Sequence, residues 1–364
     1  AARPSIADPF LPKKIEEGRP EDIRECIGCN ICYTGDGLGT PIRCTQNPTM
    51  GEEWRRGWHP ELIAKKHSDA SVLVVGAGPA GLEAARALGQ RGYQVMLAEA
   101  TRELGGRVTR ESSLPGLGEW CRVRDYRLGQ IEHMPNVEIF RESELSVDEV
   151  LSVGADHVVI ATGATWRTDG FGRSHPYPFK ALGPSTNILT PDDVMAGRMP
   201  DGPTVVYDDD SFYMGGVIAE KLRRANLPVI LVTPENTVSA WCKYTSEQYQ
   251  VQKGLLELGV EIKTAHNLLA YDGREVMISC THTEHQQSIK ADALIMVTAR
   301  QPNDGLYQAL HYRIENEEQS PLHSLRRIGD CDAPAIIAAA VYSGHRYARE
   351  LDAKPDPNML CRVE

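Results

Sequence analysis

Four cysteines near the start of the chain have the spacing of iron–sulfur ligands. They form a C-x2-C-x2-C-x11-C array made of Cys26, Cys29, Cys32 and Cys44. Three thiolates at this spacing can line one side of a cubane, and the fourth completes the set that a [4Fe–4S] cluster needs. Glycines between and after the cysteines let backbone N–H groups approach the sulfurs. The array therefore predicts a [4Fe–4S] cluster and one-electron transfer.

Two other interpretations of these cysteines stay open, a four-cysteine zinc site and unrelated thiols. Structural zinc favours two separated C-x2-C pairs, and the third cysteine of the array fits that template poorly. Residues 26–60 are rich in Gly, Pro, Asn and Thr. They predict an irregular module that a metal centre stabilises. We expect Trp54, Trp58 and His59 to pack around the cluster, with an electron path or docking surface as the alternative, and Arg55 and Arg56 to be solvated.

A glycine-rich turn predicts a nucleotide site. It follows the buried-type apolar run Ser71–Val75, precedes a segment of helical periodicity over 82–91, and consists of Gly76, Ala77, Gly78, Pro79, Ala80 and Gly81. In this fingerprint the first glycine permits the tight turn, the second lets the backbone approach a pyrophosphate, and the third allows close helix–strand packing. The alternative is a tight strand-to-helix turn without a ligand.

An acidic residue ends the next predicted strand, over 93–98. Glu99 stands 18 residues beyond the last fingerprint glycine. Its carboxylate can accept from ribose hydroxyls and would repel a 2′-phosphate, so the nucleotide is not of the NADP type. Further landmarks in the order typical of flavoproteins with two dinucleotide-binding domains are Gly105, Gly106, Arg107, Ala161, Thr162, Gly163, Gly329 and Asp330.

The second half of the chain departs from the fingerprint. A predicted strand over 204–207 is followed by Asp208-Asp209-Asp210 and not by glycines. Carboxylates repel a pyrophosphate, and the close-approach glycines are missing. We predict a nucleotide-type domain that has lost its nicotinamide site; an acidic loop that merely solvates the turn is compatible with the same conclusion.

The element order predicts an α/β fold with two Rossmann-like domains, the second inserted in the first, after a loop-rich [4Fe–4S] module. We expect the module at 1–66, the nucleotide-binding domain at 67–198 and 291–364, and the inserted domain at 199–290. Residues 260–290 alternate in polarity and predict antiparallel strands.

Composition narrows the function further. The 364-residue chain has a net charge of −11, which argues against nucleic acid or an anionic membrane as partner. No apolar run is long enough to cross a bilayer, and we expect a cytoplasmic protein. No redox C-x-x-C pair lies in the flavin-type half, which disfavours a disulfide reductase. We expect small buried hydrophobes at the remaining cysteines, Cys121, Cys242, Cys280, Cys331 and Cys361.

Longer motifs resemble one enzyme family. The chain contains C-I-G-C-N-x-C, P-I-R-C-T-Q-N-P, E-x-R-R-G-W-H-P-E over 53–61, V-V-G-A-G-P-A-G, and L-P-G-L-G-E-W over 114–120. Together they look like the C-terminal half of the trimethylamine, dimethylamine and histamine dehydrogenases. The resemblance covers nearly the whole chain from Pro4 onward.

This resemblance implies partners and cofactors that the residues alone do not give. Family members carry an N-terminal (β/α)8 barrel with a cysteinyl-linked FMN, where the amine is oxidised, and R-P-x-I-A-D-P at 3–9 looks like the end of such a barrel. We therefore expect a fragment or a separate subunit without catalytic residues of its own. The resemblance further implies ADP in the glycine-rich site, which leaves Asp330 in doubt as a ligand, and electron transfer to an electron-transferring flavoprotein. We also expect a homodimer.

Two alternatives differ in chemistry. The first is an FAD- and NADPH-dependent iron–sulfur reductase of the 2,4-dienoyl-CoA reductase type, against which residues 208–216 argue. The second is a non-redox nucleotide-binding module with structural zinc.

Overall fold

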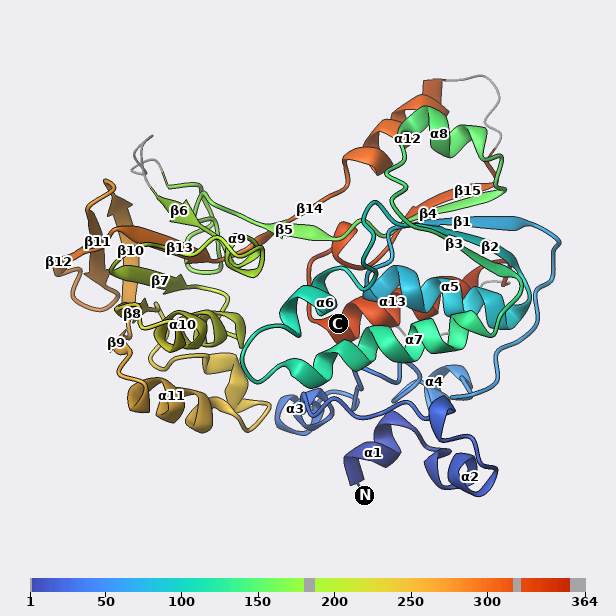
Figure 1. Cartoon of the computed structure of the whole chain (residues 1–364), viewed down its shortest axis with the longest axis horizontal. Coiled ribbons are helices and arrows are strands. Elements are labelled where there is room, and N and C mark those ends of the chain that lie inside the picture. Colours follow the sequence, from blue (N-terminus) through green and yellow to red (C-terminus); the bar gives the residue numbers. More distant parts are fainter. Residues whose placement is uncertain (1, 180–186, 317–321, 354–364) are drawn as a thin grey trace. The chain divides into compact units, whose positions relative to one another are not determined.

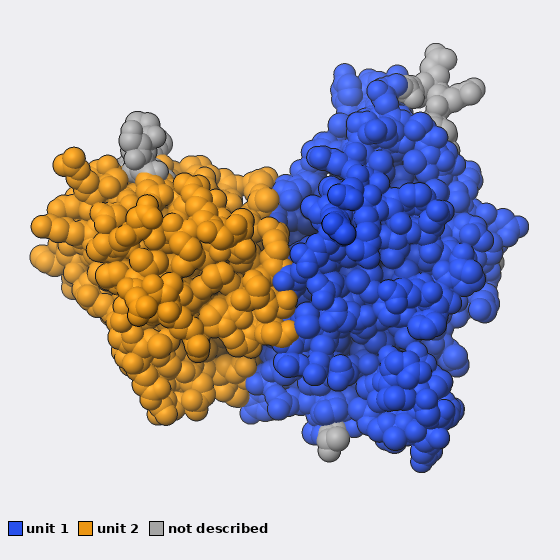
Figure 2. Space-filling model, viewed as in Figure 1, with its two compact units in different colours: residues 1–109, 119–164, 302–364 blue, residues 110–118, 165–301 orange. Residues whose placement is uncertain are grey.

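The structure is a computed structural model that describes residues 2–179, 187–316 and 322–353. The chain divides into two compact units, coloured separately in Figure 2. Unit 1 comprises residues 1–109, 119–164 and 302–364, and unit 2 comprises residues 110–118 and 165–301. Most of unit 2 is therefore one continuous insertion between two parts of unit 1, as the sequence predicts.

Unit 1 is built on a five-stranded parallel sheet with the order β15-β4-β1-β2-β3. Its strands are β1 (Ser71–Val75), β2 (Gln94–Ala98), β3 (Val137–Phe140), β4 (His157–Ile160) and β15 (Ser324–Arg327). Valine and leucine side chains of β1 and β4 are buried on both faces. Such continuous apolar strands form parallel sheets that are covered on both sides.

Helices cover both faces of this sheet (Figure 1). One face packs against α5 (Pro79–Arg91), α7 (Arg122–Glu132) and α13 (Ile337–Glu350) in a common apolar core. The other packs against α8 (Val147–Ser152) and α12 (Gly305–Asn316). The remaining short elements after β2 are α6 (Arg107–Glu111), η2 (Gly118–Cys121) and η4 (Gly329–Cys331).

Unit 2 repeats the architecture with a second parallel sheet, ordered β6-β13-β7-β8-β9. These strands are β6 (Ile188–Leu189), β7 (Thr204–Asp208), β8 (Val229–Val232), β9 (Glu261–Lys263) and β13 (Ala293–Val297). Helix α10 (Met214–Arg224) follows β7 directly. Further helices are α9 (Pro191–Met195), η3 (Ala240–Lys243) and α11 (Gln248–Glu257).

An antiparallel sheet packs on the second parallel sheet. Its strands are β10 (His266–Tyr271), β11 (Glu275–Cys280) and β12 (Gln286–Lys290), as the alternation over 260–290 predicts. Leu268, Val276 and Ile278 share a buried core with Val205 and Leu294 of the parallel sheet. Strands β5 (Ala164–Trp166) and β14 (Arg300–Pro302) pair with each other where the chain passes between the units.

The observed domain boundaries differ from the expected ones. Residues 165–198 and 291–301 belong to unit 2 and not to the first domain, because β6 and β13 are neighbours in the second sheet. Ala293–Val297 reads from sequence as a buried strand of either sheet, since both are parallel and apolar. The predicted module at 1–66 is part of unit 1 and is not a separate compact unit.

The N-terminal part is also more helical than expected. It contains α1 (Ala2–Ala7), α2 (Leu11–Glu16), η1 (Pro20–Asp22), α3 (Ile31–Leu38) and α4 (Glu53–Arg56). Each is short, and the segments between them are irregular. Within the three described ranges, no helix combines the length and apolar character needed to cross a bilayer.

The tight approach of α13 to α5 generates a stability prediction. A Cβ added at Gly344 would lie 2.1 Å from the carbonyl oxygen of Ala80, a backbone atom that cannot move aside alone. We expect Gly344→Ala to lower the free energy of unfolding by about 1–3 kcal/mol. The helical Gly129 has nothing within 4 Å of its Cβ position, so Gly129→Ala should raise it by about 0.5–1 kcal/mol. Urea denaturation measures the free energy of unfolding of both variants. The same change in Gly344→Ala as in Gly129→Ala would contradict the close packing of α13 on α5.

Candidate functional site

The four clustered cysteines line one cavity in unit 1. Its empty volume, part of it open to solvent, is about 300 Å³, and Arg3 and Gln46 also contribute to its wall. Cys26 and Cys29 precede α3, the third cysteine lies in its first turn, and Cys44 follows on a loop. Between the first two, Gly28 has φ +72°, a left-handed conformation that favours glycine. The structure thus brings all four predicted ligands together.

Hydrogen-bond donors surround the sulfurs. The N–H of Gly28 donates to Cys26 Sγ at 3.4 Å, and Thr45 Oγ1 lies 3.2 Å from Cys29 Sγ. The backbone N–H groups of Gln46 and Asn47 both donate to the sulfur of Cys44. Such donors stabilise thiolate charge and tune the potential of an iron–sulfur cluster.

Burial controls the protonation of these thiols. Burial raises the pKa of Cys29 to about 11, and it also raises the pKa of Cys32 and that of Cys44. At Cys44 the nearby Arg24 cation acts in the opposite direction. Thiols with raised pKa values are protonated at neutral pH. Because metals bind thiolates, loading of this site must release protons.

The four thiols surround a cavity whose wall also supplies N–H donors. Within the described residues, no three His, Cys, Asp or Glu side chains are grouped so that they could hold one metal ion as they stand. Four cysteines around one cavity are a donor set that a [4Fe–4S] cluster needs, and four thiolates also suit zinc.

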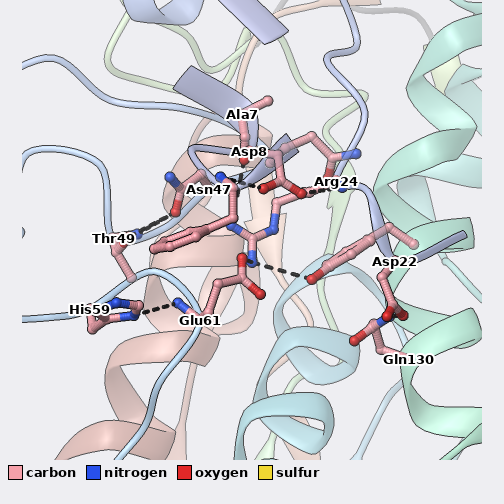
Figure 3. A network of polar contacts seen from close by, with 12 residues as sticks. Ala7, Asp8, Asp22, Arg24, Asn47, Thr49, His59, Glu61 and Gln130 are labelled. Carbon is pink, nitrogen blue, oxygen red and sulfur yellow. Dashed lines mark hydrogen bonds and ion pairs between the residues drawn. The ribbon is translucent and has the colours of Figure 1, made fainter. Parts of the chain in front are cut away.

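A buried ionic network fixes the segment that precedes the cysteines (Figure 3). The Asp8 carboxylate, fully buried, accepts from Lys14 Nζ at 2.7 Å and from the backbone N–H of Arg24 at 2.8 Å. The guanidinium of Arg24 in turn donates to the hydroxyl of Tyr126 on α7. Residues 2–25 are therefore anchored on the rest of unit 1 by buried polar contacts.

The glycine-rich turn has the geometry of its fingerprint. Gly76 has φ +102°, and a Cβ there would lie 2.5 Å from the carbonyl oxygen of Ala161. A Cβ at Gly81 would lie 1.8 Å from the carbonyl oxygen of Gly76, which confirms the close helix–strand approach. The Cβ position of Gly78 faces open space at the start of α5. That space is where a phosphate would meet the helix N-terminus.

Glu99 lies beside this turn. Its Oε2 accepts from the N–H of Ala77 at 2.8 Å, and its Oε1 accepts from the N–H and hydroxyl of Thr101. The carboxylate is thus held at the carboxyl edge of the sheet, next to the fingerprint, where the sequence places it. Oε2 accepts one hydrogen bond and so keeps a lone pair for a ribose hydroxyl.

The other glycine landmarks converge on the same turn. The N–H of Gly105 donates to the carbonyl oxygen of Ala77, and a Cβ at Gly106 would lie 3.2 Å from Gly78 Cα. Arg107 forms an ion pair with Asp330 at 2.9 Å. This pairing gives Asp330 a partner within the chain, in keeping with the doubt about its role as a ligand.

The segment over 161–163 is also tied in place. Thr162 Oγ1 donates to the carbonyl oxygen of Asn303 at 2.6 Å, and the N–H of Asn303 donates to the carbonyl oxygen of Gly163. Ala161 abuts Gly76 through its backbone. All predicted nucleotide-site residues therefore lie around one strand-to-helix turn, and their binding of a nucleotide stays a prediction.

The acidic segment of unit 2 is buried, not solvated. Asp208 Oδ1 accepts from the N–H of Ser211, and Asp209 accepts from the N–H of Ser174 through both oxygens. A Cβ at Gly215 would lie 2.4 Å from Asp208 Cγ, so this carboxyl group packs directly against the start of α10. The interpretation of a merely solvated loop is wrong, because both side chains are at most 1% exposed.

Burial also changes the charge expected there. Burial, and after it the nearby Asp210 carboxylate, raises the pKa of Asp208 to about 8. The pKa of Asp209 is raised by burial as well. Asp208 is therefore mainly protonated at neutral pH. It obstructs the start of α10 by occupying the space, more than by repelling a phosphate.

The expectation that the two tryptophans after the cysteines pack around the cluster is not met. Trp58 is buried, but it packs on α13 against Tyr342 and His345, with ring centroids 5.9 and 5.5 Å away. Trp54 is 72% exposed. Neither tryptophan lines the cysteine cavity.

The arginine pair at 55–56 is buried and not solvated. The side chains of Arg55 and Arg56 are 6% and 5% exposed, and both form ion pairs with Glu52. A fully buried carboxylate explains why two adjacent cations can leave the surface.

The remaining cysteines fall into two classes. Cys242 and Cys331 are buried, as small hydrophobes should be. Cys121 and Cys280 are only half-buried, and the hydroxyl and N–H groups around Cys280 lower its pKa. Cys361 lies outside the described residues.

Comparisons with known proteins agree with this geometry. Residues 70–176 match the model of the pyridine nucleotide-disulphide oxidoreductase family. The dimethylamine dehydrogenase of Hyphomicrobium sp. (strain x) is 40% identical over 98% of this chain and 52% of its own length. The solved structure of histamine dehydrogenase from Rhizobium sp. 4-9 is 52% identical, with a TM-score of 0.96 over 99% of this chain and 56% of that one.

This chain belongs to the trimethylamine, dimethylamine and histamine dehydrogenase family of oxidoreductases, and it matches the C-terminal portion of its members. A second solved relative, 6-hydroxypseudooxynicotine amine oxidase from Pseudomonas geniculata N1, is 44% identical with a TM-score of 0.93. It is covered over 52% of its length by 97% of this chain. The chain spans about half the length of the curated relatives it matches.

The buried Asp208 generates a pH prediction. Its pKa is about 8 in the fold, against an ordinary value of 3.8 for aspartate, so between these pH values only the folded state keeps the proton. Stability must therefore fall as pH rises from about 4 to about 8. Asp208→Asn cannot titrate. We therefore expect its free energy of unfolding to rise by a few kcal/mol relative to that of the wild type between about pH 4 and pH 8.

Calorimetric unfolding at several pH values measures this difference. Asp201→Asn, at an exposed position seven residues earlier, is the control and should follow the wild-type pH profile. Parallel profiles for Asp208→Asn and the wild type would show that Asp208 is ionised in the fold.

Proposed function

We propose that this chain is the electron-transfer portion of an iron–sulfur flavoprotein amine dehydrogenase. In this proposal single electrons come from FMN on a barrel domain or subunit, pass through a [4Fe–4S] cluster on Cys26, Cys29, Cys32 and Cys44, and leave to an electron-transferring flavoprotein. ADP occupies the glycine-rich site and is structural. The observation that carries the proposal is the convergence of the four cysteines on one cavity.

The donors around the sulfurs support this assignment. The cluster would supply one-electron transfer, and the residues of this chain would hold it and set its potential. The N–H groups directed at Cys44 and the Thr45 contact to Cys29 are the features that would stabilise negative charge on the sulfurs.

The two nucleotide-type sheets support different roles for the two units. The turn at 76–81 leaves open space at Gly78, whereas Asp208 fills the corresponding place at the start of α10. An intact first site and an obstructed second site favour a bound nucleotide without hydride exchange with a nicotinamide. Reducing equivalents would then leave through the cluster.

Replacing one ligand tests the metal assignment. Cys44→Ser should lose acid-labile sulfide and most of the iron, because a [4Fe–4S] cluster needs four thiolates. Cys121→Ser removes a thiol outside the cavity and serves as the control. Iron, zinc and sulfide per chain, with the visible spectrum, are measured in the native polypeptide. Zinc without sulfide would establish the non-redox alternative, and release of FAD with NADPH-driven bleaching would establish the reductase.

A glycine substitution tests the nucleotide site. Gly78 has φ −73° and open space at its Cβ position, so Gly78→Ala should fold but block close approach of a pyrophosphate. We expect the ADP extracted per chain to fall about tenfold or more, in line with the loss of a backbone–phosphate approach. Gly118→Ala, also with nothing within 4 Å, is the control. Undiminished ADP in Gly78→Ala would place the nucleotide elsewhere.

A further inference from the structure

A buried glutamine connects both cysteine-bearing segments to the nucleotide-type fold. Gln46 is 1% exposed and lies two residues after Cys44. Its side-chain Nε2 donates to the carbonyl oxygen of Glu25 at 3.0 Å and to that of Arg122 at 3.1 Å. Glu25 directly precedes Cys26, and Arg122 begins α7. One amide group therefore links the first ligand, the fourth ligand and a helix of the sheet's core.

Arg127 completes the attachment from α7. Its guanidinium is fully buried, and it donates to the side-chain oxygen of Gln46 at 2.9 Å and to the main-chain oxygen of Gln46 at 3.2 Å. It also donates to the carbonyl oxygen of Val123 at 2.7 Å. Both acceptor oxygens of Gln46 thus face one cation, which fixes the peptide plane between Gln46 and Asn47.

Glu83 on α5 holds this cation. Its carboxylate forms ion pairs with Arg127 at 2.8 Å and with Arg86 at 2.6 Å, and its side chain is 1% exposed. Burial lowers the pKa of His345 on α13 to about 4, so the ring is neutral. It donates from Nδ1 to Glu83 and accepts from Arg349 at Nε2, each at 2.8 Å. Three helices therefore meet at one carboxylate.

We propose that Gln46 and Arg127 are positioning residues for the cluster, which direct the N–H groups of residues 46 and 47 at the sulfur of Cys44. The inference rests on the proposed function, because it assumes a cluster on these cysteines. Neither side chain is a ligand. Outer partners of this kind typically change metal affinity by about 10- to 100-fold when they are removed.

Two substitutions of Gln46 separate its roles. Gln46→Glu keeps an oxygen for Arg127 but loses both donations to the carbonyl oxygens of Glu25 and Arg122. Gln46→Met keeps the length of the side chain and loses every polar contact. If one variant does not fold, the other gives the same comparison. Bound ADP per chain reports whether the nucleotide-type domain is intact.

The matched control is Gln130→Ala. Gln130 also lies on α7, and its amide donates to Asp22 at 2.9 Å, a contact with the same N-terminal region that is remote from any ligand (Figure 3). The Gln130→Ala substitution removes one hydrogen bond between α7 and the N-terminal region, and neither Gln130 nor Asp22 is adjacent to a cysteine in the sequence. A merely structural role of Gln46 would make its variants resemble this control.

The measurements are iron and sulfide retained under chelator, the electron paramagnetic resonance spectrum of the reduced native polypeptide, and its midpoint potential. We expect Gln46→Glu and Gln46→Met to hold iron with an affinity about 10- to 100-fold lower than that of the wild type. We also expect an altered spectrum and a shifted midpoint potential. Spectra and retention equal to those of Gln130→Ala would overturn the inference. Absence of iron and sulfide from the wild type would instead overturn the proposed function.

Discussion

The buried carboxylate of Glu83 is the interaction on which the organisation of unit 1 depends. A charge removed from water costs several kcal/mol unless partners satisfy it, and this one is met by two guanidinium groups and a neutral imidazole. Those partners lie on α5, α7 and α13, so the helices that cover one face of the sheet share a fixed register. Replacing any single partner would leave a hydrogen-bonding group of the network without its partner in the core. Apolar packing alone permits sliding of such helices, whereas this network specifies one arrangement.

The two parallel sheets show how a few side chains change the turn after a strand within a shared architecture. In unit 1 the turn after the first strand is shaped by glycines whose Cβ positions are blocked by backbone or left open. In unit 2 the strand β7 ends in Asp208, whose carboxyl group lies against the next helix at Gly215. The protein thus retains the stability of a nucleotide-type fold while filling its crevice with its own atoms. The protonated form of the carboxyl group makes this filling tolerable.

The sequence predicted the strands at 71–75, 93–98 and 204–207, the two sheets and the set of clustered cysteines, because continuous apolar runs and residue spacing are local signals. It did not predict the short strands β5, β6 and β14. It did not predict α7, whose buried positions are Val123, Arg127 and Ile131. An arginine at a core position breaks the apolar periodicity, and its partner Glu83 lies 44 residues away in the chain. The burial of the Arg55 and Arg56 side chains, which pair with Glu52, was missed for the same reason. Paired charges can enter a core, but the pairing is visible only in three dimensions.

The sequence separation of the network around the cysteines has a consequence for biosynthesis. The ligands span fewer than twenty residues near the start of the chain, but Gln46 is held by Arg127, 81 residues later, and Glu83 is met by His345, 262 residues after it. During translation the thiols leave the ribosome long before the groups that fix them. The finished site therefore exists only once nearly all of the described chain has been made. If the proposed cluster binds here, iron and sulfide would be delivered late in the synthesis of the polypeptide, and unfinished chains would expose thiols without metal.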